Sequence, residues 1–167
     1  NERGEVEGLL LFLLDVTRRK QTQRARVASE RRYRELVENV DSIIMRWKRD
    51  GEILFANRFA HQFFGYPAGS LVRINAIGAI FPETGADGAR IKSFFLTSGE
   101  NTEQHQTDEC ENMRRDGSRV WIRWTVRPVR DVAGTVTELL CVGSDITDRR
   151  RKELEMEQMQ QRLRSFA

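Results

Sequence analysis

The sequence predicts an α+β fold in which a five-stranded antiparallel sheet carries short helices on one face and a helix flanks it at each end. Three observations support this class. Strand-like and helix-like patterns follow one another as two strands, a helical region and three strands. Asp-Gly pairs stand between consecutive strand patterns, where they favour tight hairpins. The 167 residues, 39% of them hydrophobic, suit one domain with helical extensions.

The first hairpin is predicted from Ile43–Trp47 and Glu52–Ala56, two short apolar stretches on either side of Asp50-Gly51. An Asp-Gly pair is typical of turns in which two adjacent residues have positive φ. Asn57 then occupies a helix N-cap position. A helical face of apolar residues follows it, made of Phe59, Ala60, Phe63 and Phe64.

The central region is predicted to hold only short helical turns, because glycine and proline interrupt residues 65–81. Apolar residues at helical spacing predict one further helix over Ala89–Ser98. The last part of the domain is predicted to form three strands, the first two joined at Asp116-Gly117. These strands cover Gln104–Arg114, Val120–Val129 and Val136–Ser144.

An internal repeat defines the domain boundaries. The segments that begin at Gly4 and Gly134 align without a gap, at an offset of 130 residues, as far as Thr17 and Thr147. Each contains a turn glycine, an apolar strand, an Asp-Val-Thr or Asp-Ile-Thr triplet and a basic helical start. The repeat therefore predicts four parts. Residues 1–17 are the last strand of a preceding domain, 18–40 a linker helix, 41–148 a complete domain, and 149–167 the start of a C-terminal coiled-coil linker.

The two flanking segments are predicted to be exposed helices. Residues 17–36 contain eight Arg or Lys residues against two Glu, with no Gly or Pro. A nucleic-acid-binding arm would interleave aromatic residues with basic ones, and only Tyr33 is present, so no nucleic-acid partner is expected. Near the C-terminus, apolar residues at spacings of three, four and three predict the seam of a homodimeric coil, with a fraying amphipathic tail as the alternative. The seam consists of Met156, Met159, Leu163 and Phe166.

Three stretches carry a family resemblance: RDGEILFANRFAHQFFGY, RRDGSRVWIRWTVRPVRD and VGSDITDRRRKE. They resemble the opening hairpin, the fourth-strand hairpin and the closing Asp-Ile-Thr signature of a PAS domain. Such domains occur in multi-PAS bacterial and archaeal signalling proteins, including sensor histidine kinases, diguanylate cyclases and chemoreceptors. The resemblance covers about residues 30–150, with 4–20 as the tail of a preceding PAS domain. It implies a sheet that cups a small pocket, flanked by signalling helices that are usually dimeric.

The resemblance also bears on cofactors. Haem-binding PAS domains carry a histidine on the helix that corresponds to Arg90–Leu96, and this segment has none. Flavin photoreceptor PAS domains carry a cysteine in an Asn-Cys-Arg-Phe-Leu-Gln motif, and Ile74–Phe81 contains no cysteine. Haem and a photoactive flavin adduct are therefore disfavoured, and the sequence selects no other ligand.

Candidate pocket residues follow from strand parity and helical period. The apolar candidates around the inner face are Ile44, Trp47, Phe55, Phe59, Phe63, Phe94, Phe95, Trp124 and Cys141. A small organic ligand needs a few polar groups in such a setting. Those best placed to supply them are Asn57, Asn112 and Arg123.

No catalytic or metal site is predicted. Phosphate-binding loops, paired catalytic carboxylates, nucleophile elbows, a kinase phosphoacceptor helix and ATP-binding segments are all missing from the sequence. Two cysteines and two histidines are too few for a Cys/His zinc site. The longest apolar run, Leu9–Leu14, is too short to span a bilayer, so no membrane insertion is expected. A cytoplasmic location is expected from the sparse cysteines.

The predicted function is that of a sensory and dimerisation module. A signal, which a small-molecule ligand could supply, would pass through the junction Asp145-Ile146-Thr147 to a downstream effector. Asp145 and Thr147 can each hydrogen-bond the helix start. Two alternatives remain open: a ligand-free structural spacer, or the regulatory part of a histidine kinase or diguanylate cyclase. The expected partners are a second copy and neighbouring PAS and effector domains of the same protein.

Overall fold

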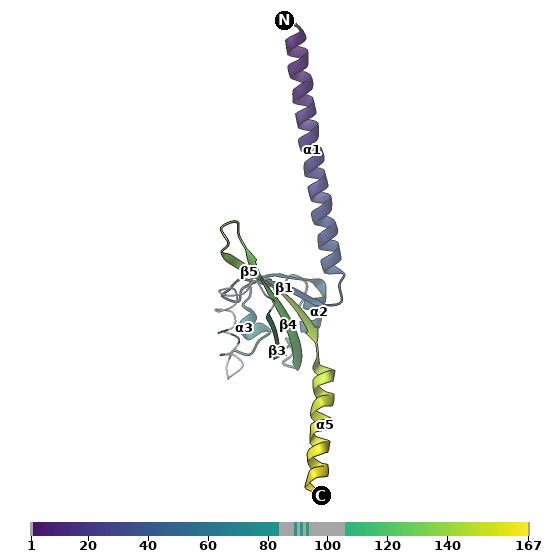
Figure 1. Ribbon diagram of the computed structural model, residues 1–167, viewed down its shortest axis with the longest axis vertical. Coiled ribbons are helices and arrows are strands. Elements are labelled where there is room, and N and C mark those ends of the chain that lie inside the picture. The colour runs from purple at the N-terminus through teal and green to yellow at the C-terminus, as the bar shows by residue number, and fades with distance from the viewer. Residues whose placement is uncertain (1, 84–88, 90, 92, 94–105, 167) are drawn as a thin grey trace. The chain divides into compact units, whose positions relative to one another are not determined.

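The computed structural model describes residues 2–83, 89, 91, 93 and 106–166. The chain divides into two compact units, Asn1–Asn39 and Val40–Ala167. The first unit is one helix, α1, which runs from Glu2 to Glu38 (Figure 1). In the described part of the chain, no helix combines the length and the apolar character that crossing a membrane requires.

Helix α1 includes the segment within residues 1–17 for which the sequence predicts a strand, and this segment is helical from Glu2 onward in this chain. A strand must hydrogen-bond to a neighbouring strand to satisfy its backbone groups, whereas a helix satisfies them within itself. The unit that contains this segment offers no second strand among its described residues. The helix is therefore the way in which the segment satisfies its own backbone.

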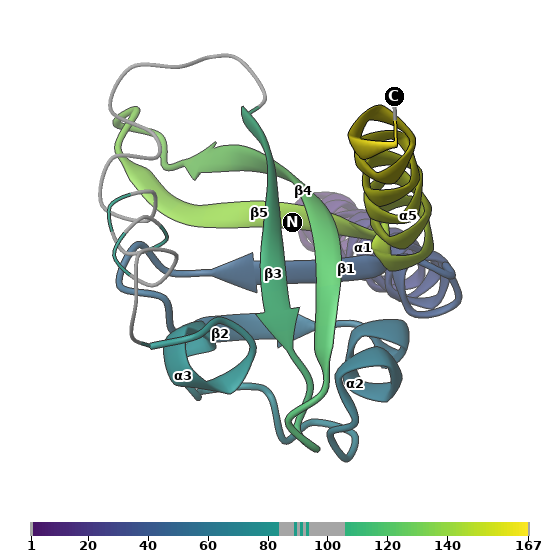
Figure 2. The ribbon, with the colours of Figure 1, turned by 90° about the horizontal axis from the view of Figure 1, so that it is seen from below.

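The second unit contains the predicted five-stranded antiparallel sheet, which confirms the fold class (Figure 2). The strands are β1 Ile43–Trp47, β2 Ile53–Ala56, β3 Gln106–Met113, β4 Arg119–Arg130 and β5 Val136–Asp145. The helices are α2 Arg58–Phe64, α3 Ala76–Ala79 and α5 Thr147–Ser165. The strands have the order β2-β1-β5-β4-β3, so β5 is central and the first and last strands in the sequence, β1 and β5, are neighbours. Helices α2 and α3 lie beside β2, and α5 continues from the end of β5 (Figures 1 and 2).

The three hairpins of the sheet use one kind of turn. In each, a glycine N–H donates to the carbonyl oxygen three residues earlier, at 2.9 to 3.0 Å. These glycines, Gly51, Gly117 and Gly134, have φ between 84° and 89°. Among the described residues, Arg73 is the only residue other than glycine with positive φ. The Asp50-Gly51 and Asp116-Gly117 turns therefore each have one positive-φ position instead of the two predicted. The left-handed glycine restores the strand twist after the turn.

The core lies on the face of the sheet that α2 and α3 adjoin. Ile43, Met45 and Trp47 of β1 are almost fully buried there. The Trp47 ring contacts two other rings edge-on, with centroid distances of 5.5 Å to Phe81 and 5.1 Å to Trp124. Each aromatic side chain in such a cluster buries a large apolar area.

Candidate functional site at the junction of the sheet and the C-terminal helix

The predicted pocket residues fall on both faces of the sheet. Phe59 and Phe63 of α2 are partly buried and pack against the core. Phe94 and Phe95 lie outside the residues that the structure describes. Five members of the predicted set are buried in the core: Trp47, Asn57, Asn112, Trp124 and Cys141.

Ile44 does not belong to the inner face, which corrects its prediction as a pocket residue. Side chains alternate between the two faces along a strand. Met45 and Trp47 are buried, and Ile44 is only partly buried on the opposite side. Ile44 and Trp47 are three positions apart, so a regular strand cannot point both to one face.

Phe55 and Arg123 also lie on the outer face. Phe55 is paired with the exposed Arg46, whose guanidinium carbon lies 5.9 Å from the Phe55 ring centroid. Arg123 is exposed and donates from Nε to the Glu109 carboxylate at 2.8 Å. Neither residue can line a pocket under the helices.

Asn57 connects β1 to the start of α2. Its Oδ1 accepts from the backbone N–H groups of Ile44 at 3.1 Å and Ala60 at 3.0 Å. Its Nδ2 donates to the carbonyl oxygen of Ser42 at 2.9 Å. The prediction of Asn57 as the N-cap is confirmed. These bonds engage its side-chain oxygen and nitrogen with the backbone, so a ligand would have to displace one of them.

Asn112 is the centre of a second buried network. Its Nδ2 donates to the Ile80 carbonyl oxygen at 3.1 Å, and its Oδ1 accepts from the Trp124 indole at 3.2 Å. The Cys110 thiol also donates to Oδ1, at 3.6 Å. The network joins the segment after α3 to β3 and β4. It satisfies polar groups in the core, which is the usual role of a buried amide.

His61 is buried and has a structural role. Its Nε2 lies 3.0 Å from the backbone N–H of Gly69 and must accept that hydrogen. Its Nδ1 therefore carries the proton and donates to the Asn57 carbonyl oxygen at 3.0 Å. Within the described residues, no group of three or more His, Cys, Asp or Glu side chains is arranged to hold a metal ion.

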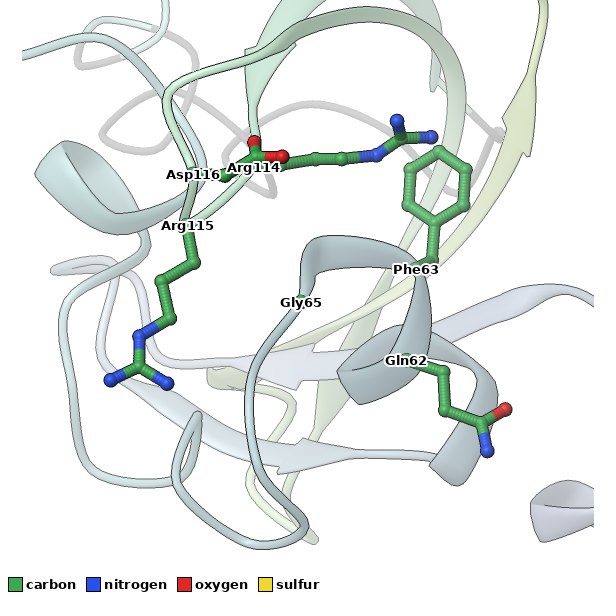
Figure 3. Close-up of a pocket in the computed structure, with 6 residues that line it drawn as sticks. All are labelled: Gln62, Phe63, Gly65, Arg114, Arg115 and Asp116. Carbon is green, nitrogen blue, oxygen red and sulfur yellow. The ribbon is translucent and has the colours of Figure 1, made fainter.

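A groove lies between α2 and the turn that joins β3 to β4. The Arg114 guanidinium lies 4.7 Å from the Phe63 ring centroid, and the Arg115 guanidinium lies 5.8 Å from that of Tyr66. Figure 3 shows the two guanidinium groups pointing in opposite directions. They do not converge on one anionic ligand. The lining residues are Gln62, Phe63, Gly65, Arg114, Arg115 and Asp116.

The end of β5 is hydrogen-bonded to the start of α5 and to β4. Asp145 Oδ1 accepts from the backbone N–H of Thr147 at 2.9 Å and from its hydroxyl at 2.6 Å. The Thr147 hydroxyl oxygen accepts from the Trp121 N–H at 3.0 Å, and the Trp121 carbonyl oxygen accepts from the Ile146 N–H at 2.9 Å. Both backbone polar groups of Trp121 thus bind the three-residue junction.

A cluster of charged groups, which we call the Glu109 clamp, holds the first turn of α5 against the sheet. It consists of Glu109 of β3, Arg123 of β4, and Arg149 and Arg150 of α5. Glu109 Oε1 accepts from Arg123 Nη2 and Arg149 Nη2, each at 2.7 Å. Arg150 lies over the Trp121 ring, 4.5 Å from its centroid. Hydrogen bonds from Arg123 and then Arg149 hold the pKa of the Glu109 carboxyl below its ordinary value.

Sequence reasoning identified the junction triplet but missed the Glu109 clamp. The Glu109–Arg123 contact could have been found, because the turn at Asp116-Gly117 fixes the register that places these residues opposite each other. The contact with Arg149 could not, because it is 40 residues away in sequence and depends on the direction in which α5 leaves the sheet.

Comparisons with known proteins agree with this architecture. A family model described as the PAS fold matches residues 31–146. None of the curated proteins compared matches the chain.

Several solved structures share the fold. The PAS domain of an HTR-like protein from Haloarcula marismortui is 19% identical, with 76% of this chain and 99% of that chain covered and a TM-score of 0.63. A PAS domain from Colwellia psychrerythraea is 20% identical, covers 73% of this chain and 98% of that one, and has a TM-score of 0.62. A sensory box histidine kinase/response regulator from Burkholderia thailandensis is 21% identical, with coverages of 80% and 98% and a TM-score of 0.60.

Proposed function

Because this chain belongs to the PAS family, whose model matches residues 31–146, we propose that it is a sensory and dimerisation module. In this proposal a change in the sheet passes through Asp145, Ile146 and Thr147 to α5 and then to an effector. The observation that carries the proposal is the double hydrogen bonding of Trp121 to the junction. A shift of β4 must either move the start of α5 or break these bonds.

The Glu109 clamp supports the same route. It joins β3 and β4 to α5 through one carboxylate, so the helix direction depends on the relative positions of two strands. Such a device needs two states whose free energies differ with the signal, and couplings of this kind are typically about 1–3 kcal/mol. A ligand or a neighbouring domain that favours one strand arrangement would shift the helix population accordingly.

Dimerisation through α5 is the second part of the proposal. Met156, Met159, Leu163 and Phe166 have exposed fractions of 64% to 88% and recur at coiled-coil spacing. A second copy of the helix would bury them, because identical stripes meet across a two-fold axis. Helix α1 is the other flanking helix through which we propose that the module dimerises.

A ligand-free spacer is the competing function, and one observation favours it. Asn57 and Asn112, the polar groups predicted to orient a ligand in the core, already bind backbone and side-chain groups of the protein. Native mass spectrometry before and after denaturation distinguishes the two functions. A bound small molecule that is lost on denaturation supports a sensor of that molecule, whereas an unliganded mass favours the spacer.

The effector and the location belong to the same proposal. The name of the Burkholderia protein favours a histidine kinase as the kind of protein that such a module regulates, and a diguanylate cyclase is the other host class that we propose. The two cysteines, Cys110 and Cys141, form no disulfide and are buried on strands that are not neighbours. Burial raises the pKa of the Cys141 thiol, so this thiol is unreactive. We expect the module to work in the cytoplasm.

The relay is tested by loosening the clamp without disturbing the core. Glu109→Gln removes the charge that holds Arg149, and we expect hydrogen exchange of the amides in Asp148–Glu153 to become several-fold faster. Glu138→Gln is the matched control, since Glu138 pairs with Arg46 on the same sheet and both glutamate side chains are 27% exposed. Equal exchange in α5 of the two variants would contradict the relay.

A further inference from the structure

Residues Gly4–Thr17 match the burial pattern of β5 and the junction. At the offset of 130 residues, each buried position between Gly134 and Thr147 corresponds to an apolar residue of the first segment. This is the pattern that a strand needs if it is to fill the same place in another sheet. The buried residues are Val136, Leu139, Cys141, Gly143 and Ile146, and their counterparts are Val6, Leu9, Leu11, Leu13 and Val16.

The polar residues of the junction are repeated as well. Asp15 and Thr17 correspond to Asp145 and Thr147, which bind each other and Trp121 in the sheet domain. In α1 the same pair makes only contacts that any helix allows. The Thr17 hydroxyl donates to the carbonyl oxygen four residues earlier, and Asp15 pairs with Arg19 on the exposed surface.

The helical conformation also leaves apolar surface in water. Leu11, Phe12, Leu13 and Leu14 have exposed fractions between 52% and 68%. Four consecutive apolar residues point around a helix in all directions, so no single partner face can cover them. In a strand at the place of β5, however, Leu11 and Leu13 would take the positions of Cys141 and Gly143, which are buried. β5 is the central strand of its sheet.

We propose that Gly4–Thr17 is the central strand and the junction of a second domain of this same fold. Its partner is the antiparallel sheet of that second domain, in which two strands that correspond to β2 and β1 lie on one side, two that correspond to β4 and β3 lie on the other, and the fifth strand is missing. In this proposal the part of α1 that stays helical begins at Thr17. That helix connects the second domain to the PAS domain of residues 41–148. The inference rests on the repeat and on burial, and it does not depend on the proposed relay.

A transplant within the full chain tests the inference. In the first chimera, Gly4–Thr17 replaces Gly134–Thr147, with glycine kept at position 143. The glycine is kept because a Cβ there would lie 2.9 Å from the Trp124 ring. In the second chimera, Cys141 is also kept, since it is fully buried and leucine is larger. The control chimera carries residues 5–18 in the same place, which shifts every side chain by one position and so to the opposite face.

The readouts are the circular dichroism of the sheet and cooperative thermal unfolding. We expect at least the second chimera to unfold cooperatively with a parent-like sheet spectrum, while the shifted control shows no cooperative transition. We also expect Thr→Val at position 147 to lower the melting temperature of the folded chimera, as we expect of the same substitution in the parent. Failure of both in-register chimeras, or equal behaviour of the second chimera and the shifted control, would overturn the inference.

Discussion

The backbone N–H of Trp121 donates a hydrogen bond to the Thr147 hydroxyl oxygen over 3.0 Å, across 26 positions of the sequence. The same hydroxyl donates to the Asp145 carboxylate at 2.6 Å. One side-chain oxygen therefore connects β4, the end of β5 and the start of α5. Two of the hydrogen bonds of the junction meet at this atom.

Removal of that oxygen should destabilise the domain. Thr147→Val keeps the shape of the side chain but leaves the partly buried Trp121 N–H without its acceptor, which costs about 1–3 kcal/mol. The melting temperature should fall by several degrees. Thr147→Ser is the control because it keeps the hydroxyl. A valine variant as stable as the serine variant would show that the bond contributes nothing.

The clamp predicts a pH dependence with a defined sign. Hydrogen bonds from Arg123 and Arg149 lower the pKa of Glu109 in the folded protein. A group with a lowered folded pKa stabilises the fold fully above its unfolded pKa and loses that contribution as the pH falls toward the folded pKa. The parent should therefore exceed Glu109→Gln in melting temperature at neutral pH. The difference should shrink as the pH falls below the ordinary glutamate pKa of about 4.3.

The size of this effect is limited because the clamp is open to solvent. Salt screens exposed ion pairs, so the difference between parent and variant should also decrease at high ionic strength. Asp116, whose pKa is lowered by hydrogen bonds from Ser118, contributes with the same sign. It is present in both proteins and cancels in the comparison. A difference that grows on acidification would contradict the assignment of the clamp.

Gly143 should tolerate no side chain. A Cβ at this position would lie 2.9 Å from Trp124 Cζ3 and 3.1 Å from Ile122 Cγ2. Gly143→Ala therefore overpacks the core, which typically costs about 1–3 kcal/mol. Ser144→Ala is the control, because Ser144 is the exposed next residue on the same strand. Equal unfolding midpoints in urea would show that the sheet can shift to make room.

Charges in the α5 seam should dissociate the dimer. Met159→Glu with Leu163→Glu places like charges where two copies would meet, and neither residue belongs to the core of the sheet domain. Sedimentation velocity should show loss of dimer, or a dimer that depends on α1 alone, with an unchanged sheet spectrum. Gln158→Glu with Gln161→Glu adds the same charge outside the seam and should leave the mass unchanged. A seam variant that dimerises through α5 as well as the parent would identify the segment as a tail.

The sheet was predictable because its signals are local. Turn glycines and the N-cap Asn57 act over a few residues, and antiparallel order follows from them. The faces were less predictable. The predicted pocket places Ile44 and Trp47 on one face of the sheet although they are three positions apart. The pairing of β1 with the edge strand β2 also shifts its register between Arg46 and Trp47. Alternation read residue by residue would have separated the two side chains.

The site was predictable only in part. The triplet Asp145-Ile146-Thr147 is visible as a repeated motif, but its acceptors and donors on β4 become apparent only when β4 and β5 are paired. The amides of Asn57 and Asn112 look like ligand groups in a sequence, since the sequence does not show which backbone groups surround them. Under the proposal that Gly4–Thr17 is a strand of a second domain, the conformation of residues 2–17 would depend on a partner sheet, which no local pattern encodes.

The positions of the three tryptophans give the protein an optical readout of its own. Trp47 and Trp124 are buried in the core with ring centroids 5.1 Å apart, whereas Trp121 lies on the other face beneath the Arg150 guanidinium. A helix that leaves the sheet uncovers only the Trp121 indole, and water then shifts its fluorescence to the red. With Trp47 and Trp124 in the same environment as before, the emission spectrum follows the first turn of α5 without an attached dye.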